Sequence, residues 1–140
     1  MSAKVFIDTN VLVYAHDADA GHKHEIAKSV VKGLSQQRSG VLSMQVLQEF
    51  YINVTRKISS PLPKSAARAI VEDFSHWCVS TSPTDIRQAF LIEDGARIGF
   101  WDSLIVAAAV KAGAAQILSE DMNHGQIIAG IRIENPFVVS

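Results

Sequence analysis

The sequence predicts an α/β domain in which helices flank a mainly parallel central sheet. Short apolar runs, typical of buried strands, alternate along the chain with longer segments whose apolar residues recur at helical spacing. The length of 140 residues suits one domain, and no repeat, low-complexity tract or linker divides the chain. We therefore expect a single domain over residues 1–140.

The first half of the chain alternates strand, helix, strand and helix. Lys4–Ile7 is a short apolar run that stops at a carboxylate, which is typical of a buried strand. Between His22 and Arg38 apolar residues recur every three or four positions, which predicts a helix. Gly40–Leu42 is a second strand candidate, and Ser43 is a suitable N-cap for the helix expected after it.

The second half continues this alternation. A proline suits the first turn of a helix, where the missing N–H would have no partner anyway, and Gly113 is a good helix C-cap. The elements expected here are helices from Pro63 to Trp77, from Pro83 onward and over Trp101–Lys111, a weak strand at 78–81, and strands at 115–118 and 131–133.

The composition excludes several classes of protein. With 48% hydrophobic and 19% charged residues the chain is neither disordered nor fibrous. Its net charge of −1 provides no overall basic field, so binding to nucleic acid would need local patches. A single cysteine, Cys78, excludes an internal disulfide framework and a cysteine zinc site. The longest apolar run, Leu104–Val110, is far shorter than the roughly 20 residues of a membrane helix. We expect a cytoplasmic protein.

Four carboxylates lie where solvated surface charges are uncommon. Asp8 directly follows one predicted strand, and Asp121 comes three residues after Leu118, the end of another. Asp102 begins the face of the last helix that should pack on the sheet, and Glu49 borders an apolar stripe beside Val46. Because the working site of a parallel sheet lies at the carboxyl ends of its strands, these four side chains could meet at one edge.

Each carboxylate also has a structural interpretation. Asp8 and Asp102 could cap helix N-termini, Asp121 could be a turn residue, and Glu49 a surface charge. As a cluster, however, they would repel: two like charges about 4 Å apart cost about 4 kcal/mol at an effective dielectric near 20. Raised pKa values or bound divalent cations would relieve the repulsion. Ligands that are all oxygen favour Mg²⁺ or Mn²⁺ over Zn²⁺, and such ions suit phosphodiester chemistry.

A series of motifs covers almost the whole chain in order. These motifs are Phe6–Tyr14 (FIDTNVLVY), Gln45–Tyr51 (QVLQEFY), Phe100–Ile105 (FWDSLI), Leu118–Met122 (LSEDM) and Glu134–Phe137 (ENPF). Together they resemble the PIN-domain nucleases, and particularly the VapC-like toxins of prokaryotic toxin–antitoxin pairs.

The resemblance implies a single PIN-like domain and a specific chemistry. It implies a Mg²⁺- or Mn²⁺-dependent endoribonuclease that leaves a 5′-phosphate and a 3′-hydroxyl, a homodimer, and a cognate antitoxin protein that blocks the site. It leaves open whether Glu120 or Asp121 faces the metal. The catalytic and metal-binding residues it implies are Asp8, Glu49, Asp102 and Asp121, with Asn10 and Ser103 as supporting polar residues.

Two other functions compete with the nuclease. An aspartyl-phosphate phosphotransferase would use Asp8 as the nucleophile, but haloacid-dehalogenase-type enzymes place a second aspartate where this chain has Asn10. A non-catalytic PIN-like module would bind RNA or a protein without cleavage, and it would have no reason to retain four mutually repelling charges.

Two further features have competing interpretations. Residues 16–24 concentrate histidine and aspartate, which could mark a metal site but is more typical of a loop that enters a helix. Trp101 could stack on a base because it adjoins Asp102, but a place in the core or in a dimer interface is the favoured interpretation.

Overall fold

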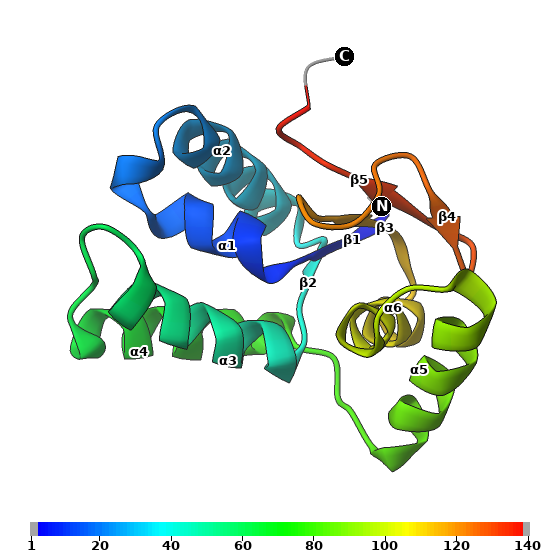
Figure 1. Ribbon diagram of the computed structural model, residues 1–140. Helices are drawn as coiled ribbons and strands as arrows, with labels where there is room; N and C mark the ends of the chain where they lie inside the picture. The colour runs from blue at the N-terminus through cyan, green and yellow to red at the C-terminus, as the bar shows by residue number, and fades with distance from the viewer. Residues whose placement is uncertain (1–2, 139–140) are drawn as a thin grey trace.

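A five-stranded sheet forms the centre of the computed structural model, which describes residues 3–138 (Figure 1). The strands lie in the order β2-β1-β3-β5-β4. All neighbouring pairs are parallel except β4 and β5, which form an antiparallel hairpin. This confirms the predicted α/β class with a mainly parallel sheet. The strands are β1 (Lys4–Ile7), β2 (Gly40–Val41), β3 (Ala114–Leu118), β4 (Ile127–Ile128) and β5 (Ile131–Glu134).

Six α-helices in the described part of the chain flank this sheet in three pairs (Figure 1). Helix α1 packs on α2, α3 on α4, and α5 on α6. A short π-helical turn at 53–57 extends α3, and 3₁₀ turns follow α1 and α4. The helices are α1 (Thr9–His16), α2 (His22–Gln37), α3 (Met44–Ile52), α4 (Lys64–Phe74), α5 (Pro83–Ala96) and α6 (Phe100–Ala112).

Local capping explains where several helices begin and end. The Ser43 side chain accepts a hydrogen bond from the Val46 N–H, as expected of the N-cap of α3. Ser82 and Asp85 form a capping box around Pro83 at the start of α5. Gly113 ends α6 with a φ of 72°, a left-handed conformation that glycine adopts without strain. These predicted boundaries are confirmed.

Other expectations were wrong in detail. The helix expected from Pro63 to Trp77 is α4, which ends at Phe74, and the chain continues to Trp77 only as a 3₁₀ turn. The strand expected at 78–81 is a single bridge between Leu42 and Cys78. Here the Trp77 ring lies so close to Gly40 that a Cβ at Gly40 would be 2.1 Å from the Trp77 Cζ3 atom. The hairpin strand β4 was not expected, because two residues are too few to produce a pattern.

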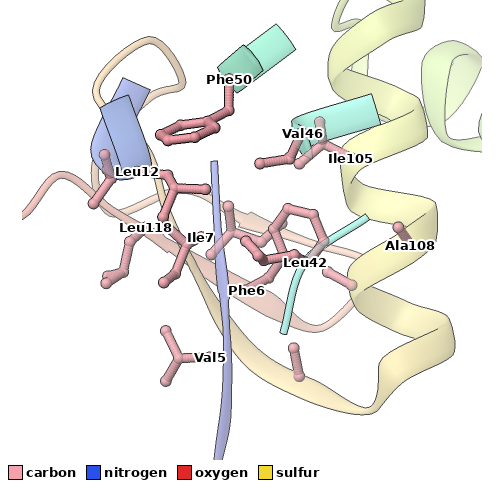
Figure 2. Close-up of a cluster of buried hydrophobic side chains, with 14 of the residues drawn as sticks. Val5, Phe6, Ile7, Leu12, Leu42, Val46, Phe50, Ile105, Ala108 and Leu118 are labelled. Carbon is pink, nitrogen blue, oxygen red and sulfur yellow. The ribbon is translucent and has the colours of Figure 1, made fainter. Parts of the chain in front are cut away.

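The largest fully buried side chains come from β1, α1, α3, β3 and β5 and from Leu42 just after β2, and Figure 2 shows part of this cluster around β1. Phe6, Ile7, Leu12 and Phe50 are fully buried. The chain therefore leaves β1 toward Asp8 from a fully buried part of the domain. Within residues 3–138, no helix combines the length and the hydropathy needed to cross a bilayer.

Candidate active site

Asp8 lies at the junction between β1 and α1, at the carboxyl end of the sheet. Its N–H donates to the Leu118 carbonyl at 2.9 Å, so its backbone is fixed to the end of β3. Its carboxylate is 8% exposed and accepts two hydrogen bonds. Oδ1 accepts from the Thr9 N–H at 2.7 Å, and Oδ2 accepts from Ser119 Oγ at 2.7 Å. Asp8 therefore caps α1, as its structural interpretation allowed, and also lies at the predicted edge.

Burial raises the pKa of Asp8 to about 6. The hydrogen bonds from Ser119 and Thr9 oppose this increase, while the negative charges of Asp102 and Asp121 add to it. The charged form of Asp8 is therefore less favourable than that of a free carboxylate, and a positive charge nearby would stabilise it.

Glu49 lies on the exposed face of α3 and is held by two neighbours. Its Oε2 accepts from Thr9 Oγ1, and its Oε1 accepts from Gln45 Nε2, both at 3.1 Å. Thr9, the residue after Asp8, therefore connects the start of α1 to Glu49, which lies 40 positions further along the chain. Gln45 Nε2 also lies 3.5 Å from the carbonyl oxygen of Trp101, which connects Glu49 to the start of α6.

Asp102 and Asp121 complete the group but are held less tightly. Asp102 is half-buried in the first turn of α6, and Asp121 is exposed after β3. Burial raises the pKa of Asp102, and the charges of Asp121 and Glu49 raise it further. Within residues 3–138, neither side chain makes a hydrogen bond, and none of the four carboxylates forms an ion pair with lysine or arginine. The structure thus brings Asp8, Glu49, Asp102 and Asp121 into one mutually repelling group.

Two hollows meet at Asp121. A cleft of about 400 Å³ is lined by Glu49, Asp121 and the side chains of α1 that face them, with Lys57 at its border. A smaller hollow of about 120 Å³ lies between Asp102 and Asp121. Glu49, Asp102 and Asp121 therefore border open space, whereas Asp8 lines neither hollow.

The carboxylates do not converge on one point. In the described part of the chain, no three His, Cys, Asp or Glu side chains stand ready to hold a metal ion. Asp8 and Glu49 are held by hydrogen bonds, whereas the Asp102 and Asp121 side chains make none among residues 3–138. The donor set of carboxylate oxygens is of the kind that Mg²⁺ or Mn²⁺ prefers.

The supporting residues differ in part from the expectation. Asn10 lines the larger hollow, and its Oδ1 accepts from the Glu120 N–H at 3.4 Å. Ser103 was expected beside the site, but it is fully buried and donates to the Gly99 carbonyl at 2.9 Å. The hydroxyl that contacts the site belongs to Ser119. It directly follows β3, as Asp8 follows β1, so strand-end position could have identified it.

Several alternatives from the sequence are resolved here. His16 and His24 bond the backbone carbonyls of Leu12 and Tyr14, and no metal-ligating group forms at 16–24 among the described residues. Trp101 is 67% exposed, which excludes a place in the core of this chain, and its place in a dimer interface stays a prediction. Glu120 turns toward Tyr14 and away from Asp8.

Comparison with known proteins identifies the family of the chain. The PIN domain family matches residues 5–127. The chain belongs to this family. The match runs from Val5 in β1 to Ile127 in β4 and includes the positions of all four carboxylates, and it confirms the resemblance found in the sequence.

Solved structures extend the likeness in fold. The chain is similar to VapBC2 from Rickettsia felis, solved bound to a DNA fragment from its promoter, with 18% identity, a TM-score of 0.64, and coverage of 94% of this chain and 97% of the other. It is also similar to VapC20 of Mycobacterium tuberculosis, a Sarcin-Ricin loop cleaving toxin, with 20% identity, a TM-score of 0.59, and coverage of 84% and 90%. No curated protein matches the sequence.

Proposed function

We propose that this chain is a Mg²⁺- or Mn²⁺-dependent endoribonuclease and the toxin of a toxin–antitoxin pair. One observation carries the proposal: four carboxylates of a PIN-domain chain repel one another at the carboxyl edge of the sheet, and no basic side chain among residues 3–138 pairs with them. Structural likeness to VapBC2 and to the toxin VapC20 supports the role. We further propose that residues 1–140 form one PIN-like domain that acts in the cytoplasm.

Asp8, Glu49, Asp102 and Asp121 would hold the metal. A bound divalent ion would lower the pKa of a water molecule and neutralise charge on the phosphodiester during hydrolysis. The chain's own residues prepare the site. Ser119 and Thr9 hydroxyls fix two of the carboxylates, and Lys57 at the cleft border supplies a positive charge for an RNA phosphate.

Cleavage of RNA by the purified chain tests this proposal. We expect total RNA to be cut at discrete sites in Mn²⁺, with 5′-phosphate ends, and to stay intact in EDTA. Asp102→Asn removes the charge of one proposed carboxylate ligand. Because the Asp102 side chain makes no hydrogen bond among residues 3–138, the fold should be retained while cleavage is lost. Equal cleavage by wild type and Asp102→Asn would show that a contaminant or another site is responsible.

The partners expected with this function are an antitoxin and a second copy of the chain. An antitoxin should place an arginine or lysine among the four carboxylates, in place of the metal charge.

Phe90 and Trp101 are exposed and joined through Phe100 by ring contacts of 5.8 and 5.3 Å, which supports an apolar face for a homodimer. Sedimentation of wild type and Trp101→Ser, and the structure of a co-purified complex, test the two partners separately.

A further inference from the structure

Glu120 directs its carboxylate away from the acidic group, although it adjoins Asp121. Its Oε1 accepts from the Tyr14 hydroxyl at 2.8 Å, and its Oε2 forms an ion pair with Lys23. Tyr14 belongs to α1 and Lys23 to α2. We call these three residues the Glu120 latch. It joins the turn after β3 to the helix pair on one side of the site.

Aromatic rings surround the charged part of the latch. Lys23 Nζ lies 5.1 Å from the centre of the Tyr14 ring and 5.7 Å from that of Phe137. The Tyr14 and Phe137 rings meet edge to face at 5.3 Å. Burial and the neighbouring Glu120 carboxylate raise the pKa of Tyr14, so the phenol keeps the proton that it donates. The latch therefore has a defined geometry, unlike a pair of long side chains in open solvent.

The same turn is also held on its other side. The Glu120 N–H donates to Asn10 Oδ1 at 3.4 Å, and the N–H groups of Asp121 and Met122 each lie 3.3 Å from Ser119 Oγ. Consecutive side chains of this turn consequently have different surroundings: Glu120 contacts α1 and α2, and Asp121 faces the charge of Asp102.

We propose that Glu120 is a positioning residue, whose bonds to Tyr14 and Lys23 fix the turn after β3 so that Asp121 points into the acidic group. The proposal rests on the proposed function, because it concerns how that site is held. Asp121 has no hydrogen bond of its own side chain among residues 3–138, so its direction depends on the backbone that the latch restrains. Without the latch, the turn would lose its attachment to α2 and would keep the bond from the Glu120 N–H to Asn10 as its link to α1, so Asp121 would have to be ordered when metal binds.

Mn²⁺ affinity, measured by titration calorimetry, tests the latch without reference to catalysis. We expect Lys23→Met, Tyr14→Phe and Glu120→Gln each to weaken Mn²⁺ binding, by about tenfold for the charge-removing variants, the lower end of what loss of an outer-shell partner costs. Lys23→Arg should restore near wild-type affinity because it keeps the ion pair. If Glu120 were instead a metal ligand, Lys23→Met would release it and strengthen Mn²⁺ binding, which would overturn the proposal.

Lys111→Met is the matched control. Lys111 of α6 forms an ion pair of similar exposure with Asp85 of α5, at 3.1 Å. Its loss should cost similar thermal stability and leave Mn²⁺ affinity unchanged. An equal fall in affinity in Lys111→Met and Lys23→Met would overturn the latch.

The proposed function has a separate test. If wild type neither binds Mn²⁺ nor cleaves RNA, the proposed nuclease activity is wrong. If wild type cleaves RNA and the latch variants keep its Mn²⁺ affinity, only the latch is refuted.

Discussion

Two halves of the acidic group differ in how the fold holds them. Both oxygens of Asp8 and both oxygens of Glu49 accept hydrogen bonds from protein donors, whereas the Asp102 and Asp121 side chains accept none within the described residues. The held pair is fixed before any ligand arrives. The free pair, Asp102 and Asp121, has no such bonds within the described residues. The difference means that hydrogen bonds orient only half of the acidic group before a ligand binds.

The largest effect should follow the loss of the most deeply held carboxylate. Asp8→Asn keeps the shape and one acceptor but removes the charge, so RNA cleavage should fall by more than the roughly 10- to 100-fold that loss of an outer-shell partner costs. Asp121→Asn, in the free pair, should cost less, because Asp121 is exposed whereas Asp8 is buried and accepts two hydrogen bonds. Single-turnover cleavage rates of both variants check the order. A larger loss in Asp121→Asn would reverse the comparison.

The second effect concerns the hydroxyl that holds Asp8. Ser119→Ala removes the donor to Asp8 Oδ2 and the acceptor of two backbone N–H groups, and we expect Mn²⁺ affinity to fall about 10- to 100-fold. Ser103→Ala is a matched control, since both serines are fully buried but Ser103 bonds only the Gly99 carbonyl. Calorimetric titration of the two variants should separate them. Equal Mn²⁺ affinities of the two variants would mean that metal binding does not depend on the orientation that Ser119 gives to Asp8.

The third effect is a dependence of stability on pH. Because the pKa of Asp8 is raised from 3.8 to about 6, the folded state binds a proton more tightly than the unfolded state. This contribution is fully present below about pH 4 and is lost as pH rises through about 6, and it amounts to about 3 kcal/mol. Asp8→Asn lacks it, so without metal the variant should become more stable than wild type as the pH rises to 7. Urea denaturation of both proteins at pH 4, 5, 6 and 7 measures the difference, and a constant difference would contradict it.

Much of this site could be predicted from sequence because strand ends can be recognised. Asp8 and Asp121 follow apolar runs, and the edge of a parallel sheet then brings them together. The choice between Glu120 and Asp121 could not be made, since it depends on where Tyr14 and Lys23 lie after α1 and α2 have packed. Ser103 was chosen in place of Ser119 for a similar reason. Ser103 is next to Asp102 in the sequence, but adjacent residues of a helix face different sides, so the Ser103 hydroxyl bonds the Gly99 carbonyl within α6.

The smallest effect should come from the link between the two held carboxylates. Thr9→Val is nearly isosteric and removes the donor at 3.1 Å from Glu49 Oε2, so we expect a loss of about 1 kcal/mol, or about fivefold in Mn²⁺ affinity. Glu49 keeps its bond from Gln45, which limits the loss. Thr55→Val removes a hydroxyl that donates to the Tyr51 carbonyl within the same helical segment and should leave Mn²⁺ affinity unchanged. Because Thr9 holds only one oxygen of Glu49, an effect as large as that of Ser119→Ala would mean that Thr9 itself contacts the metal or its water, and the held pair would then extend beyond the carboxylates.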